Sequence, residues 1–193
     1  MALEQRVYSM LIVSASQKFN KDMSDLLLRF PFQTEHAANA GEARRRCLEQ
    51  SYDFVVLNAP LKDEFGSRFC MDMTASPDTV SVMFAPADVY DDVVDKVTPH
   101  GVFVIRKPSS PSTVTQSVTL LIAARERLRS VGKKAVKAEN KLDEIRTVNK
   151  AKWFLIDNED MSENDAHKYI EKTAMDAGIS KRQAAQMIIE RYN

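Results

Sequence analysis

Five short runs rich in valine, isoleucine and phenylalanine alternate with helix-like segments over the first part of the chain. Two of the runs, "YDFVVLN" (52–58) and "GVFVIR" (101–106), are apolar almost throughout, as is typical of strands covered on both faces. The pattern predicts strands at 6–14, 32–37, 52–58, 78–85 and 101–106, and helices at 19–30, 40–50, 65–73 and 87–98.

This strand–helix alternation predicts an α/β fold of the (βα)5 type, a doubly wound parallel sheet with helices on both faces. In such sheets, ligands and chemistry gather at the carboxyl ends of the strands. We therefore expect one edge of the sheet to collect the residues that end or follow its strands. These residues are Ser14, Ala15, Ser16, Asn58, Ala85, Arg106 and Lys107.

A long helix is predicted after "KPSSPS", where Ser110 and Pro111 fit an N-cap and the first helical position. From 114 to about 157 the chain has no proline and a single glycine, and its apolar residues follow an a/d heptad pattern. The pattern favours a coiled-coil homodimer, and the alternative is one amphipathic helix folded onto its own domain. The proposed dimerisation residues are Leu121, Ala124, Leu128, Val131, Leu142 and Ile145, with Ala135 and Ala138 between them.

Two further helices are predicted at the C-terminal end. Ser162 with Asp165 resembles a capping box, Gly178 suits a helix C-terminus, and Ser180 with Gln183 begins the last helix. Together with the end of the long helix they make a three-helix unit. The predicted organisation is a sheet domain at 1–125, a coiled-coil helix at 114–145 and a three-helix domain at 142–193.

Composition indicates a soluble globular protein, with 44% apolar and 28% charged residues and no net charge. Cys47 and Cys70 are too few for a disulfide framework and are expected to be reduced thiols. The N-terminal apolar run is far shorter than the roughly 18 residues of a membrane helix and lacks the features of a signal peptide. We expect a cytoplasmic protein without a membrane partner. The three histidines show no ligand spacing, and no metal or other cofactor is predicted.

The first roughly 125 residues resemble the receiver domain of response regulators. The resemblance rests on the five βα units, on Gly66 eight positions after Asn58, and on "RKP" at 106–108. It implies an aspartate nucleophile after the third strand, acidic residues that hold Mg²⁺ after the first, a hydroxyl after the fourth and a lysine after the fifth.

This sequence departs from the receiver pattern at most of these positions. Asn58 replaces the nucleophile, Ser14–Ser16 replace the acidic pair, Ala85 replaces the hydroxyl residue, and Val104 replaces an aromatic residue. Asp53, at the opposite end of the third strand, and the loop residues Asp63 and Asp88 are poor substitutes, because nucleophile and metal ligands must be placed together. We predict a degenerate phosphoacceptor site and a receiver that acts as a scaffold or binds a regulatory protein. The site comprises Asn58, Ser14, Ala15, Ala85, Val104 and Lys107.

The segment 142–189 resembles the ANTAR domain, the RNA-binding output module of antitermination regulators. The resemblance is carried by "AK" at 151–152 with Leu155, "SENDAHKYI" at 162–170, "AM" at 174–175 and "SKRQAAQMII" at 180–189. Trp153, where the family usually has glycine, and Ile156, where methionine is common, depart from it. The resemblance implies binding to hairpins in a message leader, which prevents formation of a terminator.

Local charge agrees with an RNA partner. Between 133 and 152 there are seven basic residues and three acidic ones. We expect RNA contacts from Lys150, Lys152, Lys181 and Arg182, because cations and helix N-termini favour phosphate. The lysines of 133–141 equally fit the solvated flank of a coiled coil. Trp153 and Tyr169 are candidates for base stacking, although packing in a core or dimer is the expected role of Trp153, and packing in the core that of Tyr169.

These inferences favour a dimeric RNA-binding antitermination regulator. The alternative is a transcriptional regulator whose C-terminal helices bind DNA or a protein, because "SKRQAAQMIIE" also suits a recognition helix. No catalytic residues are predicted, since no nucleophile, base and orienting group can be assembled.

Overall fold

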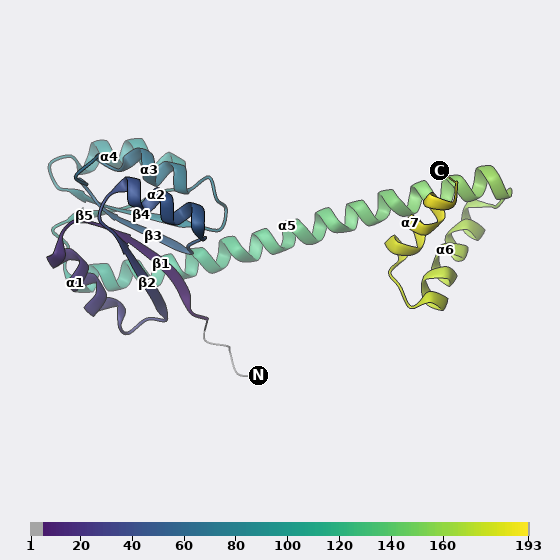
Figure 1. Cartoon of the computed structure of the whole chain (residues 1–193), viewed down its shortest axis with the longest axis horizontal. Coiled ribbons are helices and arrows are strands. Elements are labelled where there is room, and N and C mark those ends of the chain that lie inside the picture. Colours follow the sequence, from purple (N-terminus) through teal and green to yellow (C-terminus); the bar gives the residue numbers. More distant parts are fainter. Residues whose placement is uncertain (1–5, 193) are drawn as a thin grey trace. The chain divides into compact units, whose positions relative to one another are not determined.

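The structure is a computed structural model that describes residues 6–192 (Figure 1). The chain divides into two compact units, Met1–Ser130 and Val131–Asn193, which we call the sheet unit and the helical unit. One helix, α5 (Pro111–Glu159), supplies residues to both units. Within residues 6–192, none of the helices combines the length and hydrophobicity needed to cross a membrane.

The sheet unit has the predicted α/β architecture. Its five strands are all parallel and lie in the order β2-β1-β3-β4-β5, so the doubly wound sheet expected from the sequence is confirmed. The strands are β1 (Tyr8–Val13), β2 (Phe32–Ala37), β3 (Phe54–Asn58), β4 (Val80–Pro86) and β5 (Phe103–Lys107). The connecting helices are α1 (Gln17–Leu27), α2 (Ala40–Glu49), α3 (Ser67–Met73) and α4 (Tyr90–Val97), and α4 continues into a short 3-10 turn, Thr98–His100.

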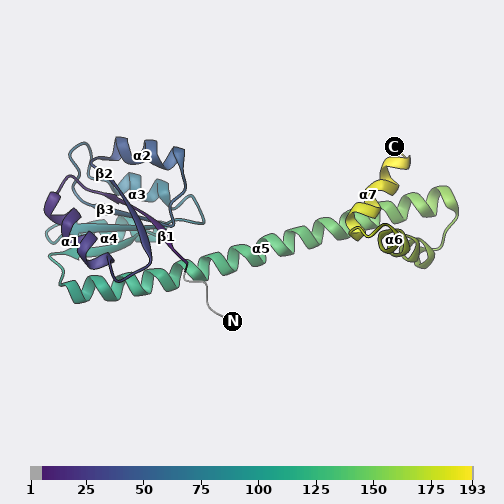
Figure 2. The same cartoon turned by 60° about the horizontal axis from the view of Figure 1, so that its bottom comes forward.

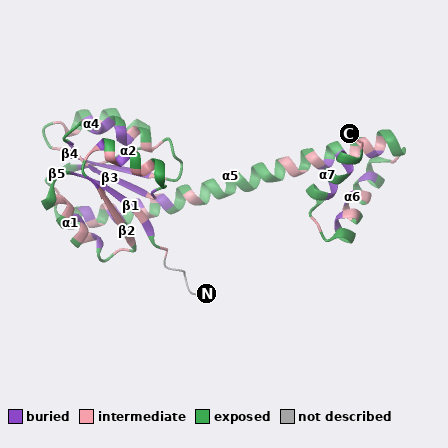
Figure 3. Cartoon of the chain, in the orientation of Figure 1, coloured by how far each residue is buried: buried purple, intermediate pink, exposed green. Residues whose placement is uncertain are grey.

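Helices cover both faces of the sheet, which explains why its central strands are apolar throughout. The helices α2, α3 and α4 lie on one face (Figure 1), and α1 and the beginning of α5 lie on the other (Figure 2). Successive residues of a strand point to opposite faces, so Leu11 and Val13 join one core cluster while Met10 and Ile12 join the other. The buried strands form the centre of the unit in Figure 3.

The first part of α5 belongs to the sheet unit. The helix begins as predicted, with the hydroxyl of Ser110 accepting a hydrogen bond from the backbone N–H of Thr113 at 3.1 Å. Val118 and Leu121 are buried against the sheet. Leu121 was predicted to lie in the dimer seam, and this prediction is wrong, because its side chain packs into the core of its own unit.

A buried ion pair holds α5 at the edge of the sheet that is formed by the amino ends of the strands. The guanidinium of Arg125 is almost fully buried and lies 2.9 Å from a carboxylate oxygen of Asp53 and 3.4 Å from one of Asp78. Asp53 also accepts a hydrogen bond from the backbone N–H of Ser9 and pairs with Arg6. Asp53 therefore has a structural role at the edge formed by the amino ends of the strands, away from their carboxyl ends.

The helical unit packs the end of α5 against α6 (Glu163–Ala177) and α7 (Lys181–Tyr192). The predicted caps at the ends of these helices are confirmed. The hydroxyl of Ser162 accepts from the N–H of Asp165, Gly178 has a left-handed φ of 61°, and Ser180 and Gln183 form a reciprocal capping box. The core consists of buried, mostly small or aliphatic side chains: Val148, Ala151, Leu155, Ala166, Ile170, Ala174, Ala184, Ala185, Ile188 and Ile189.

Candidate phosphoacceptor edge and candidate nucleic-acid interface

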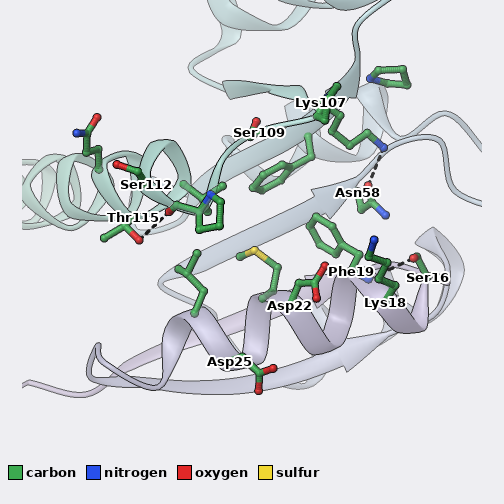
Figure 4. A pocket seen from close by; sticks show the side chains of 18 of the residues that line it. Ser16, Lys18, Phe19, Asp22, Asp25, Asn58, Lys107, Ser109, Ser112 and Thr115 are labelled. Atoms are coloured by element: carbon green, nitrogen blue, oxygen red, sulfur yellow. Dashed lines mark hydrogen bonds between the residues drawn. The ribbon is translucent and has the colours of Figure 1, made fainter.

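A chain of hydrogen bonds joins three strand ends at the carboxyl edge of the sheet. Asn58 is the last residue of β3, Lys107 is the last residue of β5, and Ser14 directly follows β1. The ammonium of Lys107 donates to Oδ1 of Asn58 at 2.7 Å (Figure 4), and Nδ2 of Asn58 donates to Oγ of Ser14 at 3.0 Å. Oγ of Ser14 also accepts from the backbone N–H of Ser16 at 3.1 Å. The parallel topology therefore brings these residues together, as the sequence indicated.

Lys107 is half-buried in this cluster and donates a second hydrogen bond to the carbonyl of Ala59. Within residues 6–192 it forms no ion pair, and desolvation lowers the pKa of its ammonium. Asn58 uses both ends of its amide, the oxygen toward Lys107 and the NH₂ toward Ser14. An ionised aspartate has only acceptor oxygens and could not make the second of these bonds.

The other predicted members of the degenerate site lie outside this hydrogen-bond chain. Ala85 is fully buried in the core beneath α2, α3 and α4, and Val104 packs against the same cluster. Ala15 is exposed. Arg106, also expected at this edge, places its guanidinium 5.6 Å from the centre of the Tyr90 ring.

The nearby acids have other structural roles or are solvated. The carboxylate of Asp63 accepts hydrogen bonds from the backbone N–H groups of Ala40 and Gly41, at 3.2 and 3.1 Å, at the first turn of α2. Burial opposes ionisation of Asp63, but these and other backbone hydrogen bonds together lower its pKa. Asp88 is exposed in the loop after β4.

A receiver fold implies a magnesium ion at this edge, and the residues present do not suit one. Mg²⁺ requires oxygen ligands, usually including carboxylates. Here the side-chain oxygen of Asn58 and the carbonyl of Ala59 accept hydrogen bonds from the cationic Lys107, while Ser14 Oγ accepts from two N–H groups. Among the described residues, no three His, Cys, Asp or Glu side chains converge as a metal site would require.

Two of the predicted RNA contacts in the helical unit are ion-paired. Nζ of Lys152 lies 2.8 Å from Glu163, and the Lys152 side chain is only 16% exposed. Nζ of Lys181 lies 2.5 Å from Glu171. The hydrogen bonds from these lysines lower the pKa of Glu163 and of Glu171. Both lysines therefore tie neighbouring helices together, α5 to α6 and α6 to α7.

The other two predicted contacts are accessible. Lys150 is exposed, with its ammonium 5.9 Å from the centre of the Phe154 ring. Arg182 is exposed in the first turn of α7 and pairs with no carboxylate in the part of the chain that the structure describes. Lys150 and Arg182 are thus better placed than Lys152 and Lys181 to meet phosphate.

Comparison with known families assigns the helical unit. Residues 137–189 match the family model described as the ANTAR domain. The chain carries an ANTAR domain at its C-terminus. The residues that carried the resemblance form its core or pack against it: Ala151, Leu155, Ala166 and Ala174 are buried and Tyr169 is partly buried. No match was found among curated protein sequences.

Solved structures show that the sheet unit has the receiver fold. The signal receiver domain of an HD domain-containing protein from Pseudomonas fluorescens Pf-5 superposes with a TM-score of 0.60 at 17% identity, covering 67% of this chain and 97% of that one. The chemotaxis response regulator CheY4 of Vibrio cholerae gives 0.53 at 17% identity, covering 60% and 99%. The receiver domain of a signal transduction histidine kinase from Syntrophus aciditrophicus gives 0.55 at 21% identity, covering 63% and 94%.

The sheet unit also contains a groove that no sequence motif indicated. It lies between α1 and the beginning of α5, has a volume of about 1240 Å³, and has Asn58 and Lys107 among its lining residues (Figure 4). Its apolar lining includes Phe19 and Leu26 of α1 and Phe84 of β4. The only hint in the sequence was the apolar spacing along α1, which predicts a buried stripe and does not reveal where a neighbouring helix leaves it uncovered.

Trp153 of the ANTAR domain is 72% exposed. Its neighbours Phe154 and Leu155 turn toward the core, whereas the indole does not. Of the two packing roles expected for Trp153, the core of its own unit is therefore excluded, and a dimer interface stays a prediction. Tyr169 does pack against that core, and its hydroxyl accepts a long hydrogen bond of 3.5 Å from Arg191.

Proposed function

We propose that this protein is an RNA-binding transcription antitermination regulator, acting in the cytoplasm on hairpins in message leaders. The match of residues 137–189 to the ANTAR domain is the observation that carries this proposal. The three-helix core places the family-like residues inside, so the resemblance extends from sequence to packing. The proposal assigns binding and no catalytic reaction to the chain.

Charge on the ANTAR domain supports an RNA partner. Exposed cations displace counterions from a phosphate backbone, and helix N-termini favour phosphate through their unpaired N–H groups. Lys150 and Arg182 provide such cations, and Arg182 lies in the first turn of α7, two residues after the N-cap residue Ser180. In this proposal Lys152 and Lys181 contribute mainly by holding the three helices together.

We further propose that the receiver domain is not phosphorylated and serves as a scaffold or a docking site for a regulatory protein. An amide at position 58 has no anionic oxygen with which to attack a phosphodonor. Its amide oxygen and its NH₂ group are already engaged by Lys107 and Ser14. Incubation with acetyl phosphate and Mg²⁺ should leave the intact mass unchanged, and a phosphoryl group mapped to the receiver would refute this part.

A homodimer is the third part of the proposal. On the single chain, Leu128, Val131, Leu142 and Ile145 of the heptad seam are exposed, and Ala124 is half-buried. Exposed apolar residues in a heptad pattern are stabilised by a partner helix. Sedimentation of a monomer at micromolar concentration would contradict it.

Gel shifts with a leader hairpin and with duplex DNA of matched sequence test the RNA assignment. We expect retardation of the hairpin and at most weak, salt-sensitive retardation of the duplex. Tight binding to the duplex alone would favour the second candidate function, a DNA-binding regulator. That candidate rests on the capped helix α7 with basic residues in its first turn, which also suits a major groove.

A further inference from the structure

The exposed indole of Trp153 continues an apolar stripe along α5. An α-helix turns about 100° per residue, so Trp153, eleven residues after Leu142, lies only about 20° around the helix from it. Leu142 is 55% and Ile145 46% exposed, and Asn149 lies between them and Trp153 on the same face. This stripe enters the segment that matches the ANTAR domain. Large exposed apolar side chains aligned on one face of a helix in this way indicate an interaction site.

The stripe changes its spacing where it reaches Trp153. A strict heptad would place the next seam residue at Lys152, but the Lys152 side chain is turned toward Glu163 of its own unit at 2.8 Å. The exposed positions instead follow steps of three, four and four residues, through Leu142, Ile145, Asn149 and Trp153. An eleven-residue spacing of this type locally unwinds a left-handed coiled coil, so that two helices can continue side by side nearly straight.

We propose that Trp153 packs against a second copy of this chain, in a parallel and in-register pair of α5 helices that brings two ANTAR domains together. The inference rests on the homodimer of the proposed function and extends its interface beyond Ile145. The second copy would cover the indole of Trp153, which is exposed on a single chain. It also makes the RNA-binding unit a paired one, with two sets of phosphate-binding cations.

Two features of α5 favour a second copy in parallel orientation. Asn149 occupies an a position, and in a parallel, in-register dimer an a-position asparagine faces its counterpart, which specifies register. Lys134 and Glu139 occupy g and e positions that attract each other across such a dimer.

The charge pattern also contains one unfavourable cross-dimer pair. Lys141 and Arg146 would meet as like charges in the parallel arrangement. Each has a carboxylate on its own helix, with Lys141 3.3 Å from Glu144 and Arg146 3.7 Å from Asp143, which reduces the repulsion.

The surroundings of the indole suit protein packing better than base stacking. RNA bases that stack on aromatic rings bring phosphates with them, which require nearby cations. Of the cations close to Trp153 along α5, Lys152 and Arg146 are paired with carboxylates, and the exposed Lys150 places its ammonium 5.9 Å from the centre of the Phe154 ring. One turn further along the same face lies the exposed acid Asp157. RNA stacking on Trp153 is therefore the outcome that the experiments must separate from dimer packing.

Disulfide crosslinking of the full chain tests the arrangement directly. In a background in which Cys47 and Cys70 are replaced by alanine, Trp153→Cys and Leu142→Cys should both give crosslinked dimers on mild oxidation without RNA. The matched control is Val136→Cys, because Val136 is 57% exposed but lies about 100° around the helix from Trp153. Crosslinking at 142 but not at 153 would overturn the inference and leave the dimer standing. Equal crosslinking at 136 and 153, or crosslinking at neither 142 nor 153, would also overturn it.

The unmodified protein provides an independent measurement, because Trp153 is its single tryptophan. The emission maximum should move to longer wavelength on dilution, at the concentration where sedimentation shows the dimer dissociating. Leader hairpin RNA added to the dimer should leave the emission nearly unchanged. Quenching by RNA without any effect of dilution would replace dimer packing with stacking. A chain that crosslinks at 153 but binds no RNA would refute the proposed function and not this inference.

Discussion

The ammonium of Lys107 lies 2.7 Å from the side-chain oxygen of Asn58, and the NH₂ group of the same amide lies 3.0 Å from the hydroxyl of Ser14. The amide at the end of β3 thus joins the residue that follows β1 to the last residue of β5. The amide accepts from Lys107 through its oxygen and donates to Ser14 through its NH₂ group, so both ends of the side chain are used.

Replacing Lys107 by methionine should destabilise the receiver domain. Lys107→Met leaves the oxygens of Asn58 and Ala59 without their donor, which costs about 1 kcal/mol, although removing a desolvated ammonium offsets part of the loss. The urea midpoint of the full chain measures the effect. Lys62→Met is the control, because Lys62 is exposed in a loop of the same unit. Identical midpoints for the two variants would show that the hydrogen bonds contribute no net stability.

Gly66 closes the loop after β3, and its substitution by alanine should be more costly than that of Gly101. Gly66 has a φ of 97°, and a Cβ there would lie 2.6 Å from a methyl carbon of Leu57, which is fully buried. Gly101 has a φ of 84° but nothing within 4 Å of the new methyl group. We expect Gly101→Ala to lose about 1 kcal/mol from backbone strain and Gly66→Ala to lose about 2–4 kcal/mol. Denaturant unfolding measures the stability of both variants. Similar losses of unfolding free energy would mean that the Leu57 side chain moves aside at little cost.

The ANTAR domain should lose stability in mild acid through Glu163 and Glu171. Hydrogen bonds from Lys152 and Lys181 hold both pKa values below the ordinary value, so these carboxyl groups bind protons more weakly in the folded chain than in the unfolded one. Their contribution is complete above the ordinary glutamate pKa of about 4.3 and is lost as the pH falls through the lowered values. Thermal melts between about pH 6 and pH 3 measure this dependence.

The double variant Glu163→Gln/Glu171→Gln is the control for the acid prediction. Its Tm should lie below that of the wild type near neutral pH and approach it as the pH falls, because neither form then has the ion pairs. A constant Tm difference across the range would show that protonation of these two groups does not weaken the domain.

Removing the accessible cations should weaken RNA binding and change its salt dependence. Lys150→Ala and Arg182→Ala should each reduce the slope of log K against log salt by roughly 1 if each neutralises one phosphate. Lys168→Ala is the control, since Lys168 is exposed on α6 among acidic residues. Gel shifts at several salt concentrations measure the slopes. Equal slopes for all three variants and the wild type would place the RNA on another face.

Local signals made much of this fold predictable. Strand positions follow from apolar runs, and the helix ends at Ser162, Gly178 and Ser180 follow from cap chemistry that involves residues only three or four apart. The gathering of Asn58, Ser14 and Lys107 followed from the parallel topology alone. Each of these inferences depends on the neighbours in sequence or on a general rule of sheets.

The failures concern contacts between elements far apart in the sequence. A heptad pattern cannot distinguish Leu121, which faces the sheet, from Leu142, which faces solvent, because both are leucines at an a position. Lys152 and Lys181 were treated as free cations because Glu163 and Glu171 meet them only through tertiary packing. The apolar neighbours of Trp153 suggested packing in a core or a dimer, but the helix turns Phe154 and Leu155 inward and the indole outward, which excludes the core of its own unit.

The buried Arg125 affects how this protein can be divided and recombined. Arg125 forms ion pairs with Asp53 and Asp78, and the residue after it, Glu126, accepts a hydrogen bond from the hydroxyl of Tyr8. The first turns of α5 are therefore part of the receiver fold. A fragment ending before Arg125 would leave Asp78 without its ion pair to α5 and Asp53 with Arg6 as its remaining cation. Chimaeras that exchange the output domain should therefore be joined after Ser130, so that the sheet unit keeps Arg125, Glu126 and their contacts.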